Sequence, residues 1–188
     1  ESACINCGTG KYGQDDEGAN AKTSCTNCGR GTYLEKVGAY DSCLECPLGF
    51  VQNVTGQAFC LPCISGSYSS EDGAAECVKC VAGKASPTVA RTTECDLCLT
   101  GRYQSRQGTT NCIDCIPGKH QNQRGKDLCY NCPTGTFSKD IRAEECVLPA
   151  EGYVAGPSKA GQVAVAVGWR ANCTGTGSNK RCSGSTVC

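Results

Sequence analysis

Cysteine is the residue type whose number and spacing in this sequence could do chemistry. Twenty of the 188 residues are cysteine, and most of them occur in Cys-x-x-Cys pairs. Thiols at this spacing bind zinc, carry out thiol–disulfide exchange or are oxidised to structural disulfides. The pairs are Cys4/Cys7, Cys25/Cys28, Cys43/Cys46, Cys60/Cys63, Cys77/Cys80, Cys95/Cys98, Cys112/Cys115 and Cys129/Cys132, and a lone Cys146 falls where a ninth pair would begin.

Zinc is the main alternative to disulfides, because Cys-x-x-Cys pairs at these distances overlap the four-cysteine zinc pattern. Zinc modules would alternate short and long spacings, whereas each pair here follows the previous one after 17, 18 or, once, 21 residues. A four-cysteine scheme would also leave Cys146 without partners. We therefore expect structural disulfides, with no metal and no cofactor, and retain an intracellular zinc protein as the alternative.

Catalytic residues are not indicated by the rest of the sequence. A redox-active Cys-x-x-Cys pair needs a βαβ context and would be single, whereas these pairs recur eight times. His120 is the only histidine and occupies a position that is aromatic in most repeats, so a packing role is expected. A Ser-His-Asp or Cys-His site is hard to build with one histidine. The sequence therefore predicts no enzyme.

The composition indicates that crosslinks, either covalent or through a metal, hold the chain together. Leu, Ile, Val and Phe make up about 15% of the residues, too few to bury the apolar surface that offsets the ordering entropy of a chain. Crosslinks then supply the missing stability. The formal net charge is zero and no basic patch stands out, which argues against nucleic-acid binding. Because disulfides persist in oxidising compartments, we expect a secreted, extracellular or cell-surface protein.

Two further features concern membranes and glycans. The longest nearly apolar run, Val163 to Val167, is too short for a transmembrane helix. Possible N-glycosylation sequons occur at Asn53-Val54-Thr55 and Asn172-Cys173-Thr174, and they fit a secreted chain with glycans as partners. The cysteine inside the second sequon is expected to lower its use.

The cysteine pairs belong to a longer repeated unit. The residue five positions after the second cysteine of each pair is usually aromatic, as Tyr12, Tyr33, Tyr68, Tyr103 and Phe137 are. Val51, Ala85 and His120 are the exceptions. A second glycine, here called the loop glycine, often precedes the next cysteine, as Gly38, Gly56, Gly73, Gly108 and Gly125. A first glycine, here called the turn glycine, stands three residues after the second cysteine of every pair: Gly10, Gly31, Gly49, Gly66, Gly83, Gly101, Gly118 and Gly135.

This unit predicts one small β-hairpin per repeat. Glycine permits positive φ and therefore tight turns at both ends of the hairpin, and the aromatic side chain is expected to lie over a neighbouring disulfide. Hairpins this small are not stable alone but stack in series, each contacting only its neighbours. We expect a small disulfide-rich fold, an elongated tandem array of hairpins of about 17–18 residues with almost no helix. Its radius of gyration should exceed the roughly 16 Å of a compact globule of this length.

The pattern C-x-x-C-x-x-G-x-Y…G…C resembles the ephrin-receptor-like cysteine-rich repeats of the GCC2/GCC3 type, and it is also similar to the short A1 module of tumour-necrosis-factor receptors. The resemblance covers residues 4 to about 146, because spacing, glycine and aromatic recur together there. Tandem arrays of such repeats are common on the surfaces of protists, including the immobilisation antigens of ciliates. The resemblance implies an extracellular coat or appendage and carries over no catalytic residue.

The resemblance also implies a disulfide pairing, in which the second cysteine of one pair bonds the first cysteine of the next. An interleaved pairing, such as Cys4–Cys25 with Cys7–Cys28, stays open on the sequence alone. In the implied ladder each closed loop contributes about 3 kcal/mol in the chain-entropy model. The ladder would consist of Cys7–Cys25, Cys28–Cys43, Cys46–Cys60, Cys63–Cys77, Cys80–Cys95, Cys98–Cys112, Cys115–Cys129 and Cys132–Cys146.

Four cysteines remain outside this ladder: Cys4, Cys173, Cys182 and Cys188. One disulfide within the tail would leave one tail thiol and Cys4 unpaired at opposite ends of the array. One hypothesis is that these two join successive subunits head to tail. The other is that Cys4 pairs with a residue removed upstream or stays free.

The sequence changes character after Cys146, so we divide it into the tandem repeats, residues 1–146, and a C-terminal β-rich, disulfide-stapled segment, residues 147–188. From Gln162 to Arg170 residues alternate in size, with Val163, Val165, Val167 and Trp169 on one face of an expected strand. This strand is expected to form the core of a C-terminal cap. Alternatively, it adds to an exposed strand edge of another subunit and so drives assembly.

The expected function is structural: a subunit of an extracellular filament, surface coat or appendage that self-associates into a homopolymer. The repetition, the absence of a catalytic constellation and the unpaired terminal cysteines favour it. The alternative is a receptor-like or adhesive ectodomain that binds a protein or glycan ligand through an exposed apolar or charged patch.

Overall fold

The computed structural model of the protein describes residues 7–14, 24–39, 42–165, 169–174 and 181–187, with side chains described up to residue 165. These residues form strands, turns and bends, and none of them is helical. The chain divides into two compact units. The first comprises Glu1–Cys80, Ser86–Cys95 and Gly108–Thr110, and the second comprises Val81–Ala85, Asp96–Gln107 and Asn111–Cys188.

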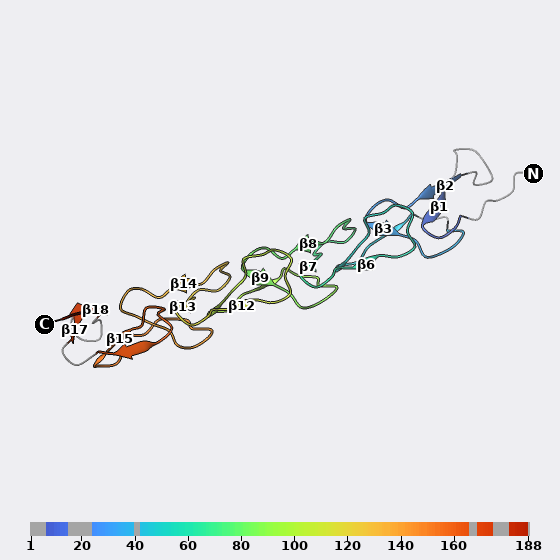
Figure 1. Cartoon of the computed structure of the whole chain (residues 1–188). Coiled ribbons are helices and arrows are strands. Elements are labelled where there is room, and N and C mark those ends of the chain that lie inside the picture. The colour runs from blue at the N-terminus through green and yellow to red at the C-terminus, as the bar shows by residue number, and fades with distance from the viewer. Residues whose placement is uncertain (1–6, 15–23, 40–41, 166–168, 175–180, 188) are drawn as a thin grey trace, which may run out of the picture. The chain divides into compact units, whose positions relative to one another are not determined.

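Antiparallel hairpins follow one another along the described chain (Figure 1). Each pairs the segment after a turn glycine with the segment around the next Cys-x-x-Cys, because the two positive-φ turns reverse the chain between them. The first unit holds β1 (Lys11–Gln14) with β2 (Ser24–Asn27), β3 (Thr32–Tyr33) with β4 (Leu44–Glu45), β5 (Phe50–Val51) with β6 (Leu61–Pro62), and β7 (Ser67–Tyr68) with β8 (Val78–Lys79).

The second unit continues the same arrangement. Its hairpins are β9 (Lys84–Ala85) with β10 (Asp96–Leu97), β11 (Arg102–Tyr103) with β12 (Ile113–Asp114), β13 (Lys119–His120) with β14 (Tyr130–Asn131), and an isolated bridge between Phe137 and Val147. It ends in β15 (Tyr153–Ala155) with β16 (Gln162–Ala164), and β17 (Trp169–Thr174) with β18 (Arg181–Val187). The predicted small disulfide-rich fold of short hairpins with a C-terminal β segment is confirmed.

A disulfide closes each of the eight successive hairpins. In every case the second cysteine of one pair bonds the first cysteine of the next, with Cα atoms 5.6 to 5.8 Å apart: Cys7–Cys25, Cys28–Cys43, Cys46–Cys60, Cys63–Cys77, Cys80–Cys95, Cys98–Cys112, Cys115–Cys129 and Cys132–Cys146. This is the ladder that the resemblance implies. The interleaved pairing is excluded because Cys7 bonds Cys25 and not Cys28.

Backbone hydrogen bonds tie each repeat to the following one. The turn-glycine N–H donates to a carbonyl of the next hairpin, as from Gly31 to Gln52 O at 2.7 Å. The N–H of a second cysteine donates to the preceding turn-glycine carbonyl, as from Cys46 to Gly31 O at 2.9 Å. The loop-glycine N–H donates to the carbonyl of the second cysteine that begins the previous repeat, as from Gly56 to Cys28 O at 2.8 Å. The same bonds recur within both units, so the ladder is hydrogen-bonded as well as crosslinked.

The turn glycine lies against a repeat two positions further along the chain. Gly66 has a φ of +85°, and a Cβ built on it would overlap with the backbone carbonyl of Gly108. Positive φ is itself unfavourable for residues with a Cβ. The expectation that each repeat contacts only its neighbours is therefore wrong, because backbone contacts reach the next repeat but one.

The core of the repeats is sulfur and polar side chains. Two positions of the repeat are buried in turn along the chain: the second cysteine of each pair and the residue directly after the aromatic position. The buried residues at the latter position are Leu34, Gln52, Ser69, Ser86, Gln104, Gln121 and Ser138. The aromatic side chains at Tyr33, Tyr68 and Tyr103 are only half-buried, whereas Phe137 is buried. The sequence pattern thus located the hairpin, but the buried residue is one position later than the aromatic.

The backbone pattern of the repeats extends beyond Cys146. Gly152 has the positive φ of a turn glycine, 82°, and its carbonyl accepts a hydrogen bond from Val165 N–H at 2.9 Å, as a turn glycine does from the next second cysteine. Lys159 occupies the loop position with a φ of 56°. Its Nζ donates to Cys132 O at 2.6 Å. In earlier repeats the backbone N–H of the loop residue donates to the corresponding cysteine carbonyl. β15 and β16 therefore form a repeat without its own disulfide, and the domain boundary at residue 146 stays a prediction.

The single strand expected from Gln162 to Arg170 is wrong. β16 ends at Ala164 and pairs with β15, and β17 begins at Trp169. The strand ends because Val165 instead gives its N–H to the Gly152 turn. Val163 is 48% exposed, so it forms no cap core among the described residues.

The turn-glycine contact predicts a graded response to alanine. Gly66→Ala adds both positive-φ strain and a backbone overlap, whereas Gly152→Ala adds the strain alone, because nothing lies within 4 Å of a Cβ at Gly152. We expect Gly152→Ala to cost about 1–2 kcal/mol from left-handed φ and Gly66→Ala to cost clearly more. Chemical denaturation of the oxidised protein measures both, and equal losses would contradict the interlocking of alternate repeats.

Candidate functional site

Cysteine sulfur lies at the centre of each repeat. The second cysteine of each of the eight pairs is buried, with exposed fractions between 0 and 2%. Every one of these sulfurs is bonded to a first cysteine, so none is available as a thiolate ligand. The four-cysteine zinc alternative is therefore contradicted for the cysteines of the ladder.

His120 lies beside the last disulfide of the ladder. Its Nδ1 is 3.2 Å from Cys146 Sγ, and its ring centroid is 6.4 Å from that of Tyr130 on the paired strand. His120, Cys132 and Cys146 form a cluster of metal-ligating residue types, but the two sulfurs are bonded to each other. The arrangement is packing of an imidazole on a disulfide, which is what the aromatic position of the repeat predicts for His120.

Buried glutamines hold the loops of three repeats. In the third repeat Gln52 Nε2 donates to Phe59 O at 2.8 Å, and Gln52 Oε1 accepts the Val54 N–H at 3.0 Å. The same two bonds connect the amide of Gln104 to the loop of the sixth repeat and that of Gln121 to the loop of the seventh. Each glutamine side chain thereby gives a hydrogen-bond partner to one backbone carbonyl and to one backbone N–H of its loop.

Serine takes the place of glutamine in the fourth, fifth and eighth repeats. In the fifth repeat an arginine completes the role. Ser86 Oγ accepts the Thr88 N–H at 3.3 Å. Arg91 donates from Nε to Glu94 O at 2.9 Å and from Nη2 to the same oxygen at 2.6 Å. Glu94 immediately precedes the next cysteine, as Phe59 does in the third repeat. Arg91 thus provides the bond that the longer glutamine provides elsewhere.

Exposed apolar residues recur at one position of the repeat in both units, and we call them the apolar row. It consists of the residues after the first cysteines, Leu44, Leu61, Val78, Ile113, Tyr130 and Val147, which are all exposed. Each is the direct cross-strand partner of an aromatic-position residue, and directly opposed side chains share a face of the hairpin. The fifth hairpin differs because Ala85 pairs with Asp96. These apolar pairs were not recognised in the sequence, although the apolar residue directly after most first cysteines is visible there.

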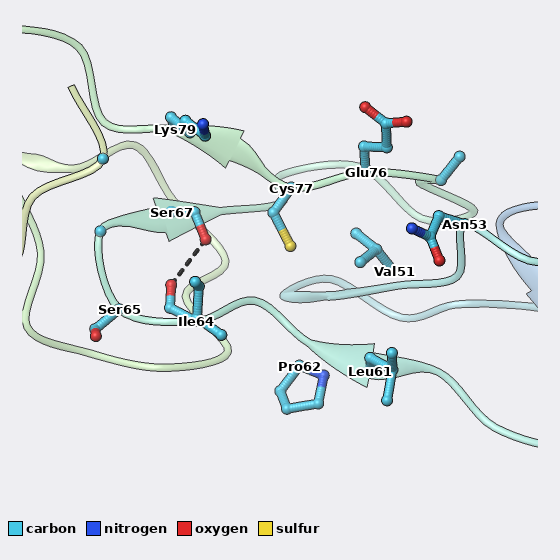
Figure 2. Close-up of a pocket in the computed structure, with 13 residues that line it drawn as sticks. Val51, Asn53, Leu61, Pro62, Ile64, Ser65, Ser67, Glu76, Cys77 and Lys79 are labelled. Carbon is cyan, nitrogen blue, oxygen red and sulfur yellow. Dashed lines mark hydrogen bonds between the residues drawn. The ribbon is translucent and has the colours of Figure 1, made fainter.

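A pocket of about 320 Å³ lies on the first unit (Figure 2). Its apolar lining includes Val51, Leu61 and Ile64, and Ile64 is 74% exposed. Asn53 and Lys79 contribute polar groups. The pocket therefore combines apolar side chains, of which Leu61 belongs to the apolar row, with polar groups that can form hydrogen bonds.

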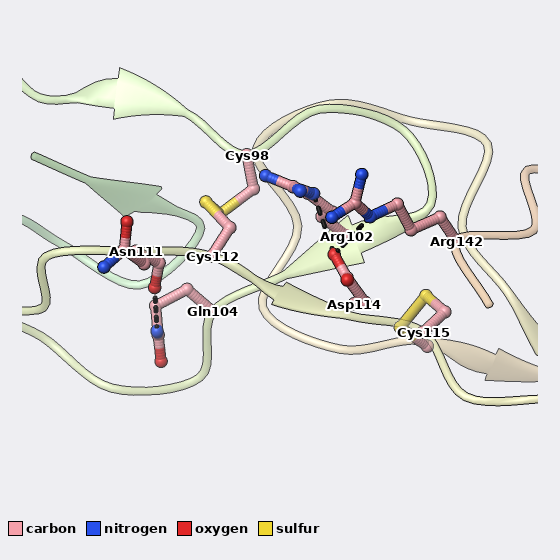
Figure 3. Close-up of polar contacts among 9 residues, drawn as sticks. Cys98, Arg102, Gln104, Asn111, Cys112, Asp114, Cys115 and Arg142 are labelled. Carbon is pink, nitrogen blue, oxygen red and sulfur yellow. Dashed lines mark hydrogen bonds and ion pairs between the residues drawn. A yellow bond between two sulfur atoms is a disulfide. The ribbon is translucent and has the colours of Figure 1, made fainter.

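Two arginines converge on one carboxylate in the second unit (Figure 3). Asp114 Oδ1 lies 2.8 Å from Arg102 Nε and 2.9 Å from Arg142 Nε. Arg142 occupies a loop-glycine position with a φ of 62°. The ion pair with Asp114 links β12 to this later repeat.

The other predicted site residues are only partly described. Asn53 is exposed at the pocket rim, whereas Asn172 lies in β17, whose side chains are not described. Cys4, Val167 and Cys188 lie outside the described residues. The register of β17 and β18 places Cys173 opposite Cys182.

Comparison with known proteins agrees with these features. Residues 18–56 match the family model described as "Tyrosine-protein kinase ephrin type A/B receptor-like". A search of curated proteins finds no match to the chain. The matched segment spans two cysteine pairs and the start of the next hairpin, and the same unit is repeated along the ladder. The described residues contain no helix that is long and apolar enough to cross a membrane.

The buried glutamines predict a specific loss of stability. Gln121 is 0% exposed, and Gln121→Leu would leave the Leu128 carbonyl and the Gln123 N–H without their partners. Each unsatisfied group costs about 1–3 kcal/mol, so thermal unfolding of the oxidised protein should show a large drop in Tm. Gln123→Leu, at an exposed position of the same loop, is the control and should leave Tm nearly unchanged. Similar Tm values for the two variants would rule out this role of Gln121.

The backbone register predicts one pairing in the tail. Because Cys173 and Cys182 face each other across β17 and β18, we expect a Cys173–Cys182 disulfide in addition to the ladder. Mass spectrometry of peptides from the alkylated, non-reduced protein should recover this pair. Recovery of Cys173 or Cys182 joined to Cys188 would show that the expectation is wrong.

Proposed function

We propose that this array of ephrin-receptor-like cysteine-rich repeats is a structural subunit of an extracellular filament, surface coat or appendage. The observation that carries the proposal is that a disulfide closes each repeat and that recurrent backbone hydrogen bonds connect it to its neighbours. A chain fixed in this way has little conformational entropy left to lose when it enters an assembly. Its stiffness also needs no large apolar core.

The cysteine chemistry supports a location outside the cytosol. Disulfides of this number persist in oxidising compartments, and ephrin-receptor-like cysteine-rich repeats fit an extracellular, disulfide-rigidified module. Such modules have structural or ligand-binding roles, so the proposal includes no catalytic step.

Self-association has three candidate sources in the chain. The apolar row offers exposed aliphatic and aromatic side chains that a second copy would bury. Cys4 and one tail cysteine outside the predicted Cys173–Cys182 pair would add covalent links between subunits. The exposed Val163 in β16 is the third source, an apolar side chain that a second copy could cover.

A receptor-like or adhesive ectodomain is the second candidate. The pocket lined by Val51, Leu61 and Ile64 favours it, because an apolar floor with a polar rim is the usual form of a small ligand site. The two functions differ in what accompanies the purified protein: a binding ectodomain retains a different molecule in stoichiometric amount, whereas a coat subunit retains copies of itself.

The structural proposal predicts covalent and non-covalent multimers of the secreted chain. Non-reducing electrophoresis should show a series of multimers that reductant converts to monomer. Cys4→Ser or Cys188→Ser alone should limit the covalent species to dimers, and the double variant should be monomeric on the gel. Native electron microscopy should still show assemblies held by the apolar row.

The same preparation tests the extended array. X-ray scattering of the double variant under dissociating conditions should give a radius of gyration above the roughly 16 Å expected for a compact globule of this length. A protein that stays a uniform monomer by electrophoresis, microscopy and scattering would contradict the filament or coat proposal. A stoichiometric foreign ligand in that monomer would favour the binding ectodomain instead.

A further inference from the structure

The pocket on the first unit includes a residue that can be chemically modified. Asn53, at its rim, begins the sequence Asn53-Val54-Thr55, in which asparagine is the acceptor of N-linked glycans in secreted proteins. Asn53, Val54 and Thr55 are all exposed. The acceptor amide therefore lies at the surface and beside an apolar hollow at the same time.

The loop that carries Asn53 is fixed from within. The buried Gln52 side chain accepts the Val54 N–H at 3.0 Å and donates to Phe59 O at 2.8 Å. The nitrogen and the oxygen of the Gln52 amide are therefore both bonded, whereas no hydrogen bond to the Asn53 amide occurs among the described residues. In Figure 2 the Asn53 amide lies near Val51 at the end of the group of pocket residues.

The pocket has the chemistry of a carbohydrate subsite. Sugar rings present faces of C–H groups that pack on aliphatic side chains, and the acetamide methyl of N-acetylglucosamine is apolar. Val51, Leu61 and Ile64 supply such a surface, and Lys79 supplies a donor for the sugar hydroxyls. The cavity volume of about 320 Å³ is at the lower end of small-ligand sites.

We propose that Asn53 carries an N-linked glycan whose first N-acetylglucosamine residue packs over this pocket and covers it. The occupant is set by attachment, because the acceptor asparagine itself lines the hollow. The inference rests on the extracellular location in the proposed function and not on assembly. Covering Ile64, which is 74% exposed, removes an adhesive apolar surface from water.

The modification is a group transfer from a lipid-diphosphate-linked oligosaccharide in the secretory pathway. A bond forms between Asn53 Nδ2 and the anomeric carbon of the first sugar. The bond between that carbon and the diphosphate oxygen breaks, and the lipid diphosphate leaves with its electron pair. The amide loses one proton, which the leaving diphosphate takes up.

The seventh repeat supplies a matched control for the acceptor position. Asn122 follows the buried Gln121 as Asn53 follows the buried Gln52, and it is also exposed. Its sequence, Asn122-Gln123-Arg124, is not a sequon. Arg124→Thr would create one at the equivalent loop position.

Peptide mass spectrometry of the full chain, secreted from a eukaryotic host, tests the attachment. We expect a glycan on Asn53 that is lost in Asn53→Gln and in Thr55→Ala, and a new glycan on Asn122 in Arg124→Thr. An unmodified Asn53 in the wild-type chain would overturn the proposal, whether or not Asn122 is modified in the variant. These outcomes are read separately from the multimer assays, so failure of one proposal does not imply failure of the other.

Enzymatic release of the glycan by peptide-N-glycosidase tests whether the glycan covers the pocket. The native protein should release the Asn53 glycan more slowly than the denatured protein, and Ile64→Ser should accelerate native release by about five- to tenfold, the effect of losing roughly one buried aliphatic contact. Ile116→Ser is the control, because Ile116 also follows a second cysteine and is 60% exposed, but it does not line this pocket. Equal native rates for wild type and Ile64→Ser would show a glycan that does not pack on the pocket and would overturn this part.

Discussion

The disulfide between consecutive cysteine pairs is the constraint on which the other features of the repeats depend. Most strands of the ladder are two residues long, and a hairpin of that size is not stable in water. Closing a loop of 14 to 18 residues contributes about 3 kcal/mol per disulfide in the chain-entropy model. The same bond places a sulfur at the centre of each repeat, where an aliphatic side chain would otherwise be needed. In each repeat the disulfide is therefore both the crosslink and the centre of the core.

Close backbone packing explains which glycines the repeat requires. At the turn position of Gly66 a Cβ would meet the backbone carbonyl of Gly108, which cannot move without disrupting another repeat. At the loop position of Gly108 a Cβ would meet only the Lys79 side chain, which can rotate away. Non-glycine residues accordingly occupy loop positions, as Ala90 and Arg142 do, at the cost of a positive φ. All eight turn positions of the cysteine pairs keep glycine.

The sequence predicts the hairpins and their order because cysteine and glycine act locally and recur with a fixed spacing. The ladder pairing came from a resemblance, since spacing alone leaves several pairings open. The role of Gln52 and Gln121 was missed, because a polar residue beside an aromatic suggests exposure unless the loop it must satisfy is known. The repeat formed by β15 and β16 was missed because it lacks the cysteines that defined the search. The packing of alternate repeats depends on backbone contacts, and the turn glycine is the only sign of these contacts in the sequence.

The distribution of side chains reverses that of an ordinary domain, and this bears on function. Glutamine and serine are buried with the disulfides, whereas Leu61, Ile113 and other members of the apolar row remain exposed. Because these side chains stay about half exposed, part of their apolar surface is available for contacts with other molecules. Within each unit the row recurs with the cysteine spacing. A second copy of the chain carries that spacing by construction, which is why the proposed function treats the row as a source of self-association.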